Sequence, residues 1–374
     1  MIANSGEYRK KNGQRGYVMM NNFIFENKTK VYFGKGGVKE YLGGLLANFG
    51  ETVMLAYGSG SIKCNGVYDE IMGILNAQGK CVVEFSGIMS NPTYAKVQDG
   101  AKLARENHVD LILAVGGGSV SDCCKVISAQ ANLNEDIWEM QYTKHTLPTK
   151  FIPLGTIVTV FGTGSEMNNG AVITHEEKKI KGALWGAQAE FAFLDPAYSL
   201  SVPMQQVISG AFDTLSHAME TYFGKPDENN LSDDTNEAAM AENGVLKIGK
   251  VTDFQAHQIQ HQLGAYTDCN HGAGLAVIHP VLYRHIYKSG TARFTRWAQN
   301  VWGIAPKGSD GETAAGIDAL AAFIKEIGLP ASFAELGIPA DTDFRAVADS
   351  TNITAGYCKK LTRDEICEIL QECL

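Results

Sequence analysis

Residues 110–125, DLILAVGGGSVSDCCK, decide how this 374-residue chain folds. Residues 110–115 form an apolar run with the length of a strand that is buried on both faces. Three glycines follow, Gly116 to Gly118, and Ser119 then begins a segment with helical character. A buried strand that passes through glycines directly into a helix is typical of a parallel α/β sheet.

Similar short apolar runs recur through the first half of the chain, separated by segments with helical spacing such as VYDEIMGILNAQG at 67–79. They are KVYFG at 30–34, TVMLAYG at 52–58, CVVEFSG at 81–87, FIPLGTIVTV at 151–160 and FAFLDP at 191–196. The first half is therefore predicted to be a doubly wound, Rossmann-like parallel sheet.

The second half contains amphipathic helical segments, such as AAGIDALAAFIKEIGLP at 314–330, and few strand-like runs. We therefore expect an α/β domain over 20–199 and an all-α helical domain over 200–374. Residues 1–19 carry charges and glycines without an apolar stretch, and we expect them to be a disordered extension.

Composition narrows the kinds of partner. The net charge is −9 and the 32 Lys and Arg residues are scattered, which argues against a nucleic-acid surface. No run of eighteen apolar residues is present that could span a membrane. Eight cysteines without a CxxC pair are interpreted as reduced thiols in the cytoplasm. Small molecules are the expected partners.

The glycines at 116–118 predict a pyrophosphate site, because glycine lets backbone N–H groups approach a phosphate and the next helix begins there. The alternative is a tight turn that binds nothing. The pattern is neither GxGxxG nor the GxxxxGK[ST] of a Walker loop, so a kinase or ATPase has little support.

A second glycine turn, YGSGSIK at 57–63, follows an earlier predicted strand. NAD-binding sites usually place a carboxylate near the ribose 2′-hydroxyl, whereas this turn offers small donors and the cation of Lys63. It therefore favours a 2′-phosphate, and so NADP(H). The alternative is a plain turn before a helix.

Histidines gather in the second half, in FDTLSHAME at 212–220 and DFQAHQIQHQLGAYTDCNHGAG at 253–274. Asp213 and His217 are four residues apart and share one face of a helix, which by itself is weak evidence for a site. His257 and His261 repeat that spacing, and His271 follows. One carboxylate with up to three imidazoles suits Zn(II) or Fe(II).

Taken together, these motifs resemble the iron-containing (group III) alcohol dehydrogenases, and within them the NADPH-dependent butanol dehydrogenase and aldehyde reductase branch. YGSGSIK, GGGSVSDCCK, TVFGTGSEM, FAFLDP, GAFDTLSHAME and HQIQHQLGAYTDCNHG carry the resemblance, which extends from about Asn22 nearly to the C-terminus. It implies a dehydroquinate-synthase-like fold, NADP(H) in preference to NAD(H), and Fe(II), with Zn(II) as the alternative metal.

The resemblance also assigns residues to roles. Asp213, His217, His257 and His271 match the metal ligands, and His261 matches a histidine beside nicotinamide and substrate. The cofactor positions that match are Gly58, Ser59, Gly60, Ser61, Lys63, Asn91, Gly117, Gly118, Ser119, Asp122, Thr159, Thr163 and Lys181, with Lys179 as a rival for Lys181. A homodimer is expected from the same resemblance.

The expected reaction is hydride transfer between NADP(H) and a primary alcohol or aldehyde, with His261 or water supplying the proton. The chain departs from the family between His217 and His257, where it is shorter by roughly 20 residues or more, the length of one or two helices. A shortened nucleotide-binding paralogue with impaired catalysis is therefore one alternative. A lyase like dehydroquinate synthase is another, although few basic residues accompany the histidines.

Overall fold

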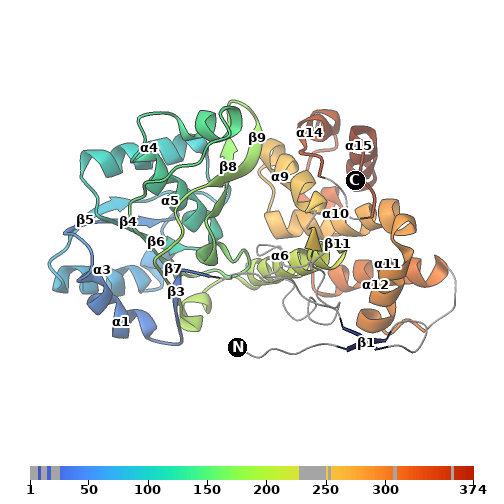
Figure 1. Ribbon diagram of the computed structural model, residues 1–374, viewed down its shortest axis with the longest axis horizontal. Helices are drawn as coiled ribbons and strands as arrows, with labels where there is room; N and C mark the ends of the chain where they lie inside the picture. Colours follow the sequence, from blue (N-terminus) through green and yellow to red (C-terminus); the bar gives the residue numbers. More distant parts are fainter. Residues whose placement is uncertain are drawn as a thin grey trace. The chain divides into compact units, whose positions relative to one another are not determined.

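The computed structural model describes residues 7–9, 15–17, 26–226, 250–251, 254–305, 310–354 and 358–374. The chain forms two compact units (Figure 1). The sheet unit comprises Asn27–Ala211 and His261–Gly272, and the helical unit comprises Met1–Glu26, Phe212–Gln260 and Ala273–Leu374. The predicted division of the chain into domains 20–199 and 200–374 remains a prediction.

A six-stranded parallel sheet forms the centre of the sheet unit and confirms the predicted fold. Its strands are β3 (Lys30–Phe33), β4 (Thr52–Tyr57), β5 (Cys81–Phe85), β6 (Leu111–Gly116), β7 (Leu154–Val158) and β10 (Phe191–Leu194). They are arranged in the order β3-β10-β7-β6-β4-β5. The strand of the glycine-rich stretch, β6, therefore lies inside the sheet between β7 and β4.

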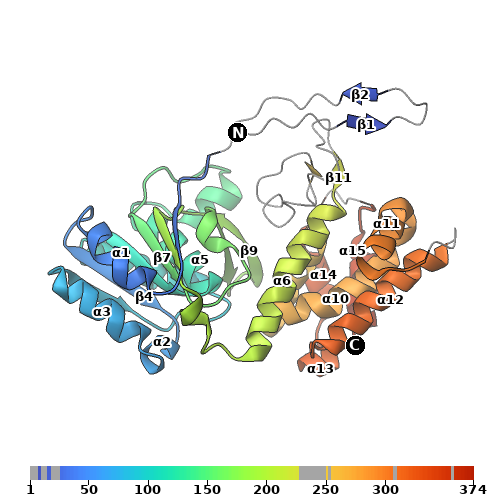
Figure 2. The ribbon, with the colours of Figure 1, turned by 90° about the horizontal axis from the view of Figure 1, so that it is seen from below.

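Helices cover both faces of this sheet (Figures 1 and 2). They are α1 (Gly37–Leu46), α3 (Val67–Ala77), α4 (Tyr94–Glu106) and α5 (Gly118–Gln130). Along β6, Leu111, Leu113 and Val115 join the core with α1 and α3, whereas Ile112 and Ala114 join the core with α4 and α5. Successive side chains of a strand point to opposite faces, so a sheet covered on both faces requires this continuous apolar run.

An antiparallel hairpin, β8 (Gly170–His175) with β9 (Ile180–Trp185), follows the loop after β7. The sequence did not predict it, because its residues mix polar and apolar types without a long buried run. The hairpin packs beside α5 and supplies Lys181 to the site described below.

The helical unit is mostly helical, as the sequence predicted. Its helices include α6 (Met204–Tyr222), α9 (Gln255–Thr267), α10 (His271–Ile286), α11 (Thr291–Trp302), α12 (Asp310–Glu326), α13 (Phe333–Leu336), α14 (Phe344–Ser350) and α15 (Arg363–Glu372), of which α6, α9 and α10 also contribute residues to the sheet unit. Short strands also occur, because β11 (Lys225–Pro226) pairs with β12 (Lys250–Val251). None of the described helices combines the length and apolar character needed to cross a membrane.

Residues 7–9 and 15–17 form a small antiparallel pair, β1 with β2, so part of the predicted N-terminal extension is paired strand. An isolated two-stranded pair of this length is marginal in water.

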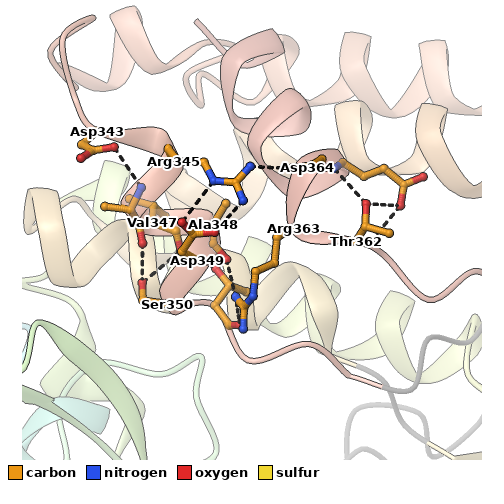
Figure 3. Close-up of polar contacts among 12 residues, drawn as sticks. Asp343, Arg345, Val347, Ala348, Asp349, Ser350, Thr362, Arg363 and Asp364 are labelled. Atoms are coloured by element: carbon orange, nitrogen blue, oxygen red, sulfur yellow. Dashed lines mark hydrogen bonds and ion pairs between the residues drawn. The ribbon is translucent and has the colours of Figure 1, made fainter.

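Polar contacts join α14 and α15 near the C-terminus (Figure 3). Arg345 pairs with Asp349 on its own helix and with Asp364 on α15. Arg363 Nη1 donates to the carbonyl oxygens of Ala348 at 2.7 Å and Thr351 at 3.1 Å. These carbonyls lie at the C-terminal end of α14, where Ala348 O also accepts from the N–H of Thr351 at 3.3 Å, so the guanidinium adds to the cap of this helix.

Candidate metal and cofactor site

Two helices bring three of the predicted ligands together in the helical unit. Asp213 and His217 lie one turn apart on α6, and His257 lies at the start of α9. One ligand atom from each residue lies within 4.8 Å of the others, and among the described residues this is the group of His, Cys, Asp and Glu side chains that could hold a metal ion.

The three side chains point toward one another. Asp213 Oδ1 lies 3.5 Å from His217 Nε2 and 3.4 Å from His257 Nε2. The two imidazole rings are 4.6 Å apart at 71°. A carboxylate oxygen with two imidazole nitrogens is a donor set that Fe(II) and Zn(II) both accept, so these residues fit the predicted metal.

Glu220 fixes the orientation of His257 and was not predicted. Its side chain is fully buried, Oε2 accepts a hydrogen bond from His257 Nδ1, and Oε1 accepts from the backbone N–H of Ala256 at 2.7 Å. Burial disfavours the charged form of His257, but Glu220 and Asp213 outweigh burial and raise its pKa to about 9. Because Glu220 engages Nδ1, Nε2 of His257 is turned toward Asp213.

Phe254 packs against both ligand histidines and was also missed. Its ring centroid lies 5.4 Å from that of His217 and 5.1 Å from that of His257. Its φ of 54° is left-handed, which is uncommon for a bulky residue and costs about 1–3 kcal/mol. The strain is retained where the chain turns into α9 to present His257.

His261 and His271 belong to the sheet unit. Their rings stack at 5.4 Å and 28°, and His271 begins α10. Neither is in the group formed by Asp213, His217 and His257. That His271 is the fourth metal ligand, and that His261 lies beside the nicotinamide and the substrate, stay predictions.

The predicted pyrophosphate turn joins β6 directly to α5. A Cβ atom on Gly118 would lie 2.3 Å from Thr163 Oγ1, and one on Gly117 would lie 3.2 Å from Val160 Cβ. Gly118 therefore requires the absence of a Cβ atom, whereas at Gly117 a Cβ atom would fit only with a small shift of Val160. The backbone N–H of Thr159 donates to Gly116 O at 2.9 Å. Two predicted cofactor residues, Thr159 and Thr163, therefore lie beside the turn.

Asp122 and the unpredicted Lys125 hold that segment against α5. Asp122 accepts hydrogen bonds from Val172 N at 2.9 Å and from Ser165 Oγ, so protein donors already engage both carboxylate oxygens. Lys125 is fully buried and donates to Ser165 Oγ at 2.8 Å and Gly170 O at 2.6 Å. Burial lowers the pKa of Lys125 to about 8, with Asp122 acting against it.

Asn91 and Lys181, two of the predicted cofactor residues, lie in contact in the structure. Lys181 Nζ donates to Asn91 Oδ1 at 2.7 Å, and Asn91 Nδ2 donates to Asp268 Oδ1 at 2.5 Å. Lys181 is buried, whereas the rival Lys179 places its ammonium 5.5 Å from the ring of Tyr266. The choice of Lys181 over Lys179 stays a prediction.

The second glycine turn, residues 58–61, connects β4 to the short helix α2 (Ser61–Cys64). Lys63 Nζ lies 3.3 Å from Oε2 of Glu84 on β5. No carboxylate was predicted near this turn, because Glu84 is more than twenty residues away in sequence and reaches it through strand pairing.

Comparison with known proteins gives two matches to family descriptions. Residues 28–196 match "Iron-containing alcohol dehydrogenase", and residues 239–374 match "Fe-containing alcohol dehydrogenase family, C-terminal". A probable NADH-dependent butanol dehydrogenase 1 of Bacillus subtilis is 35% identical over 391 residues, covering 95% of this chain and 100% of that protein. An NADPH-dependent aldehyde reductase YqhD of Escherichia coli is 32% identical over 355 residues, covering 85% and 90%.

Among solved structures, the NADH-dependent butanol dehydrogenase A of Thermotoga maritima has a TM-score of 0.84 and 30% identity, covering 95% of this chain and 99% of that one. The aligned length of 391 residues with the Bacillus protein exceeds the 374 residues of this chain, so this chain lacks residues that the relative has. The segment predicted to be short, between His217 and His257, includes 227–249, which lie outside the described residues.

Proposed function

This chain belongs to the iron-containing alcohol dehydrogenase family, and from that premise we propose that it transfers a hydride reversibly between NADP(H) and a primary alcohol or its aldehyde. It is an NAD(P)-dependent oxidoreductase that acts on alcohols and aldehydes. The observation that carries the proposal is the convergence of Asp213, His217 and His257 within 4.8 Å.

Asp213, His217 and His257 are proposed to hold the metal, with His271 as the fourth ligand. A divalent ion held there would supply Lewis-acid chemistry at the carbonyl oxygen, and a bound nicotinamide would supply the hydride. Glu220 holds the His257 ring with Nε2 facing Asp213, so that less reorientation is needed when the ion binds.

His261 is proposed to pass a proton, directly or through water, to the oxygen of the product alcohol. It is buried and stacks on His271, which restricts the motion of its ring. An imidazole changes its charge near neutral pH and is therefore suited to such a transfer.

The two glycine turns are proposed to bind the cofactor, with Gly117, Gly118 and Ser119 at the pyrophosphate and residues 58–63 at the adenosine end. Lys63 supports a preference for NADP(H), because its ammonium can pair with a 2′-phosphate. Relatives at similar identity are named for NADH and for NADPH, so the preference has to be measured.

Butanol and butyraldehyde are the proposed substrates, since several relatives are named butanol dehydrogenases.

We also propose that the protein is a homodimer in the cytoplasm. Sedimentation velocity tests the oligomeric state. All eight cysteines are free thiols, which agrees with a reducing compartment.

A second function is a nucleotide-binding protein with impaired catalysis. The segment predicted to be short between His217 and His257 favours it, because the loss of a helical block there would disturb the position of His257. Metal content separates the two functions, since an impaired protein would bind NADPH without retaining stoichiometric metal.

The test is turnover of the full chain, purified anaerobically and loaded with Fe(II) or Zn(II), with butyraldehyde and either NADPH or NADH. We expect metal-dependent oxidation of NADPH, its loss in His217→Ala, and its retention in His145→Ala, which changes an exposed histidine outside the site. Full turnover by His217→Ala would refute the metal assignment. A folded protein that binds NADPH but oxidises none would favour the impaired paralogue.

A further inference from the structure

Glu84 collects three partners at the carboxyl ends of β4 and β5. Its Oε2 accepts a hydrogen bond from the Tyr57 hydroxyl at 2.6 Å, and its Oε1 accepts from the Tyr68 hydroxyl at 2.7 Å. Lys63 Nζ lies 3.3 Å from Oε2. Three donors thus hold the carboxylate in one orientation beside Lys63.

Lys63 is also held by the two tyrosines. Its ammonium lies 5.2 Å from the ring centroid of Tyr57 and 4.4 Å from that of Tyr68. The Tyr57 hydroxyl, together with Glu84, raises the pKa of Lys63 to about 12. The Tyr57 and Tyr68 hydroxyls, followed by Lys63, lower the pKa of Glu84. Both members of the pair are therefore charged at neutral pH.

This charged pair lies beside the second glycine turn, residues 58–61, which is called the adenosine turn below because it is proposed to take the adenosine end of the cofactor. Tyr57 immediately precedes Gly58, and the segment that follows Glu84 runs along the turn. Gly87 N donates to Gly58 O at 2.9 Å, and Ile88 N donates to Tyr57 O at 3.3 Å. A group bound at residues 58–61 would therefore meet both the cation and the carboxylate.

We propose that Glu84 is a specificity-determining residue that limits the preference for NADP(H) by engaging Lys63 and by adding negative charge beside the ribose. The inference rests on the proposed function, in which residues 58–63 take the adenosine end. A 2′-phosphate carries nearly two negative charges at neutral pH, so Lys63 attracts it and Glu84 repels it. The 2′-hydroxyl of NADH is neutral and can donate to a carboxylate.

The expected effects are modest, because the Lys63 and Glu84 side chains are 47% and 42% exposed and water screens them. Removing Glu84 alone should favour NADPH, and removing Lys63 alone should favour NADH. The change expected for each is about two- to fivefold in relative affinity, the range of an exposed ion pair.

The experiment measures the dissociation constants of NADPH and NADH by nicotinamide fluorescence, in the full chain at low salt. The ratio of the two constants is the readout, because a general loss of folding or binding affects both cofactors alike. The variants are Glu84→Gln, Glu84→Ala, Lys63→Met and Lys63→Arg.

Glu190→Gln is the matched control. Lys28 and Glu190 form an ion pair of similar length, 3.1 Å, and similar exposure, 47% and 45%, beside β3 and β10, whereas β5 is at the opposite edge of the sheet. The control changes net charge by the same amount away from the adenosine turn, so it separates a local effect from a general one.

We expect relative affinity for NADPH to rise in Glu84→Gln and Glu84→Ala, to fall in Lys63→Met, and to stay within about twofold in Lys63→Arg and Glu190→Gln. These differences should shrink as salt approaches 1 M. An unchanged or lowered relative affinity for NADPH in both Glu84 variants, or an equal rise of that relative affinity in Glu190→Gln, would overturn the role of Glu84.

The wild-type result distinguishes this inference from the proposed function. If wild type binds NADH more tightly but the variants keep their order, the NADP(H) preference fails and the role of Glu84 stands. If NADPH-dependent turnover is present but the Glu84 variants leave the ratio unchanged, the function stands and the inference fails. Binding of neither cofactor would refute both.

Discussion

Replacing Glu220 by Gln should weaken metal binding without removing any ligand. Glu220 uses both carboxylate oxygens, Oε1 for the N–H of Ala256 at 2.7 Å and Oε2 for His257 Nδ1. A glutamine side chain has one oxygen, and its amide nitrogen would face the second N–H donor. One of the two buried donors therefore loses its partner.

The magnitude follows from that lost contact. A hydrogen bond to a charged group contributes about 1.5–3 kcal/mol, and a buried donor left without a partner costs a similar amount. If His257 loses the contact, its ring is no longer held with Nε2 toward Asp213. Loss of such an orienting partner typically lowers metal affinity about 10- to 100-fold.

Chelator competition with Zn(II) measures the affinity, and urea denaturation of the metal-free protein measures the stability. Ser216→Ala is the matched control, because Ser216 is equally buried on α6 but pairs with His279 Nε2 at 2.7 Å. It should lower stability and leave metal affinity within about twofold. Wild-type metal affinity in Glu220→Gln would refute the orienting role.

Three further predictions concern the sheet unit. The pKa of Lys125 is about 8 in the folded protein and 10.5 in the unfolded chain. Burying its charged form therefore lowers the free energy of unfolding by the full amount below pH 8, and this destabilisation disappears as the pH rises to 10.5. We therefore expect the difference in unfolding free energy between wild type and Lys125→Met, measured by urea denaturation, to rise by about 3 kcal/mol from pH 7.5 to 10.5. A difference that does not change with pH would contradict this prediction. Gly118→Ala should weaken NADPH binding about tenfold, because its Cβ would lie 2.3 Å from Thr163 Oγ1; unchanged fluorescence titrations would argue against the close approach. Lys181→Met should raise the KM for NADPH about tenfold and Lys179→Met should leave it within twofold, and the reverse order would reassign the role.

The inner strands β4, β6, β7 and β10 were predictable because each is buried on both faces and so reads as a continuous apolar run, whereas the edge strands β3 and β5 are partly exposed. β6 is the clearest case, since its five apolar residues join two cores and its glycines mark the turn into α5. The β8–β9 hairpin was missed because glycines and polar residues interrupt its apolar residues, so neither strand carries a long apolar run.

The metal centre was predictable as a group of residue types but not as a geometry. Asp213, His217 and Glu220 stand at positions i, i+4 and i+7 of one helix, a spacing that places all three on the same face. The glutamate was visible in FDTLSHAME, and its spacing was a signal that could have identified it. That it contacts His257 depends on how α9 packs against α6, which no local pattern encodes.

By itself, the sequence determined the order of the strands of the parallel sheet and of the helices between them, the two glycine turns and the set of candidate metal-binding residues, because these depend on local periodicity and residue chemistry. Only the tertiary structure decided which partners the charged side chains contact. Glu84 reaches Lys63 through the pairing of β5 with β4, Lys125 reaches Gly170 through the packing of α5 on β8, and Glu220 reaches His257 across two helices. Each contact joins residues more than twenty positions apart, and electrostatic interactions depend on distance in space rather than along the chain.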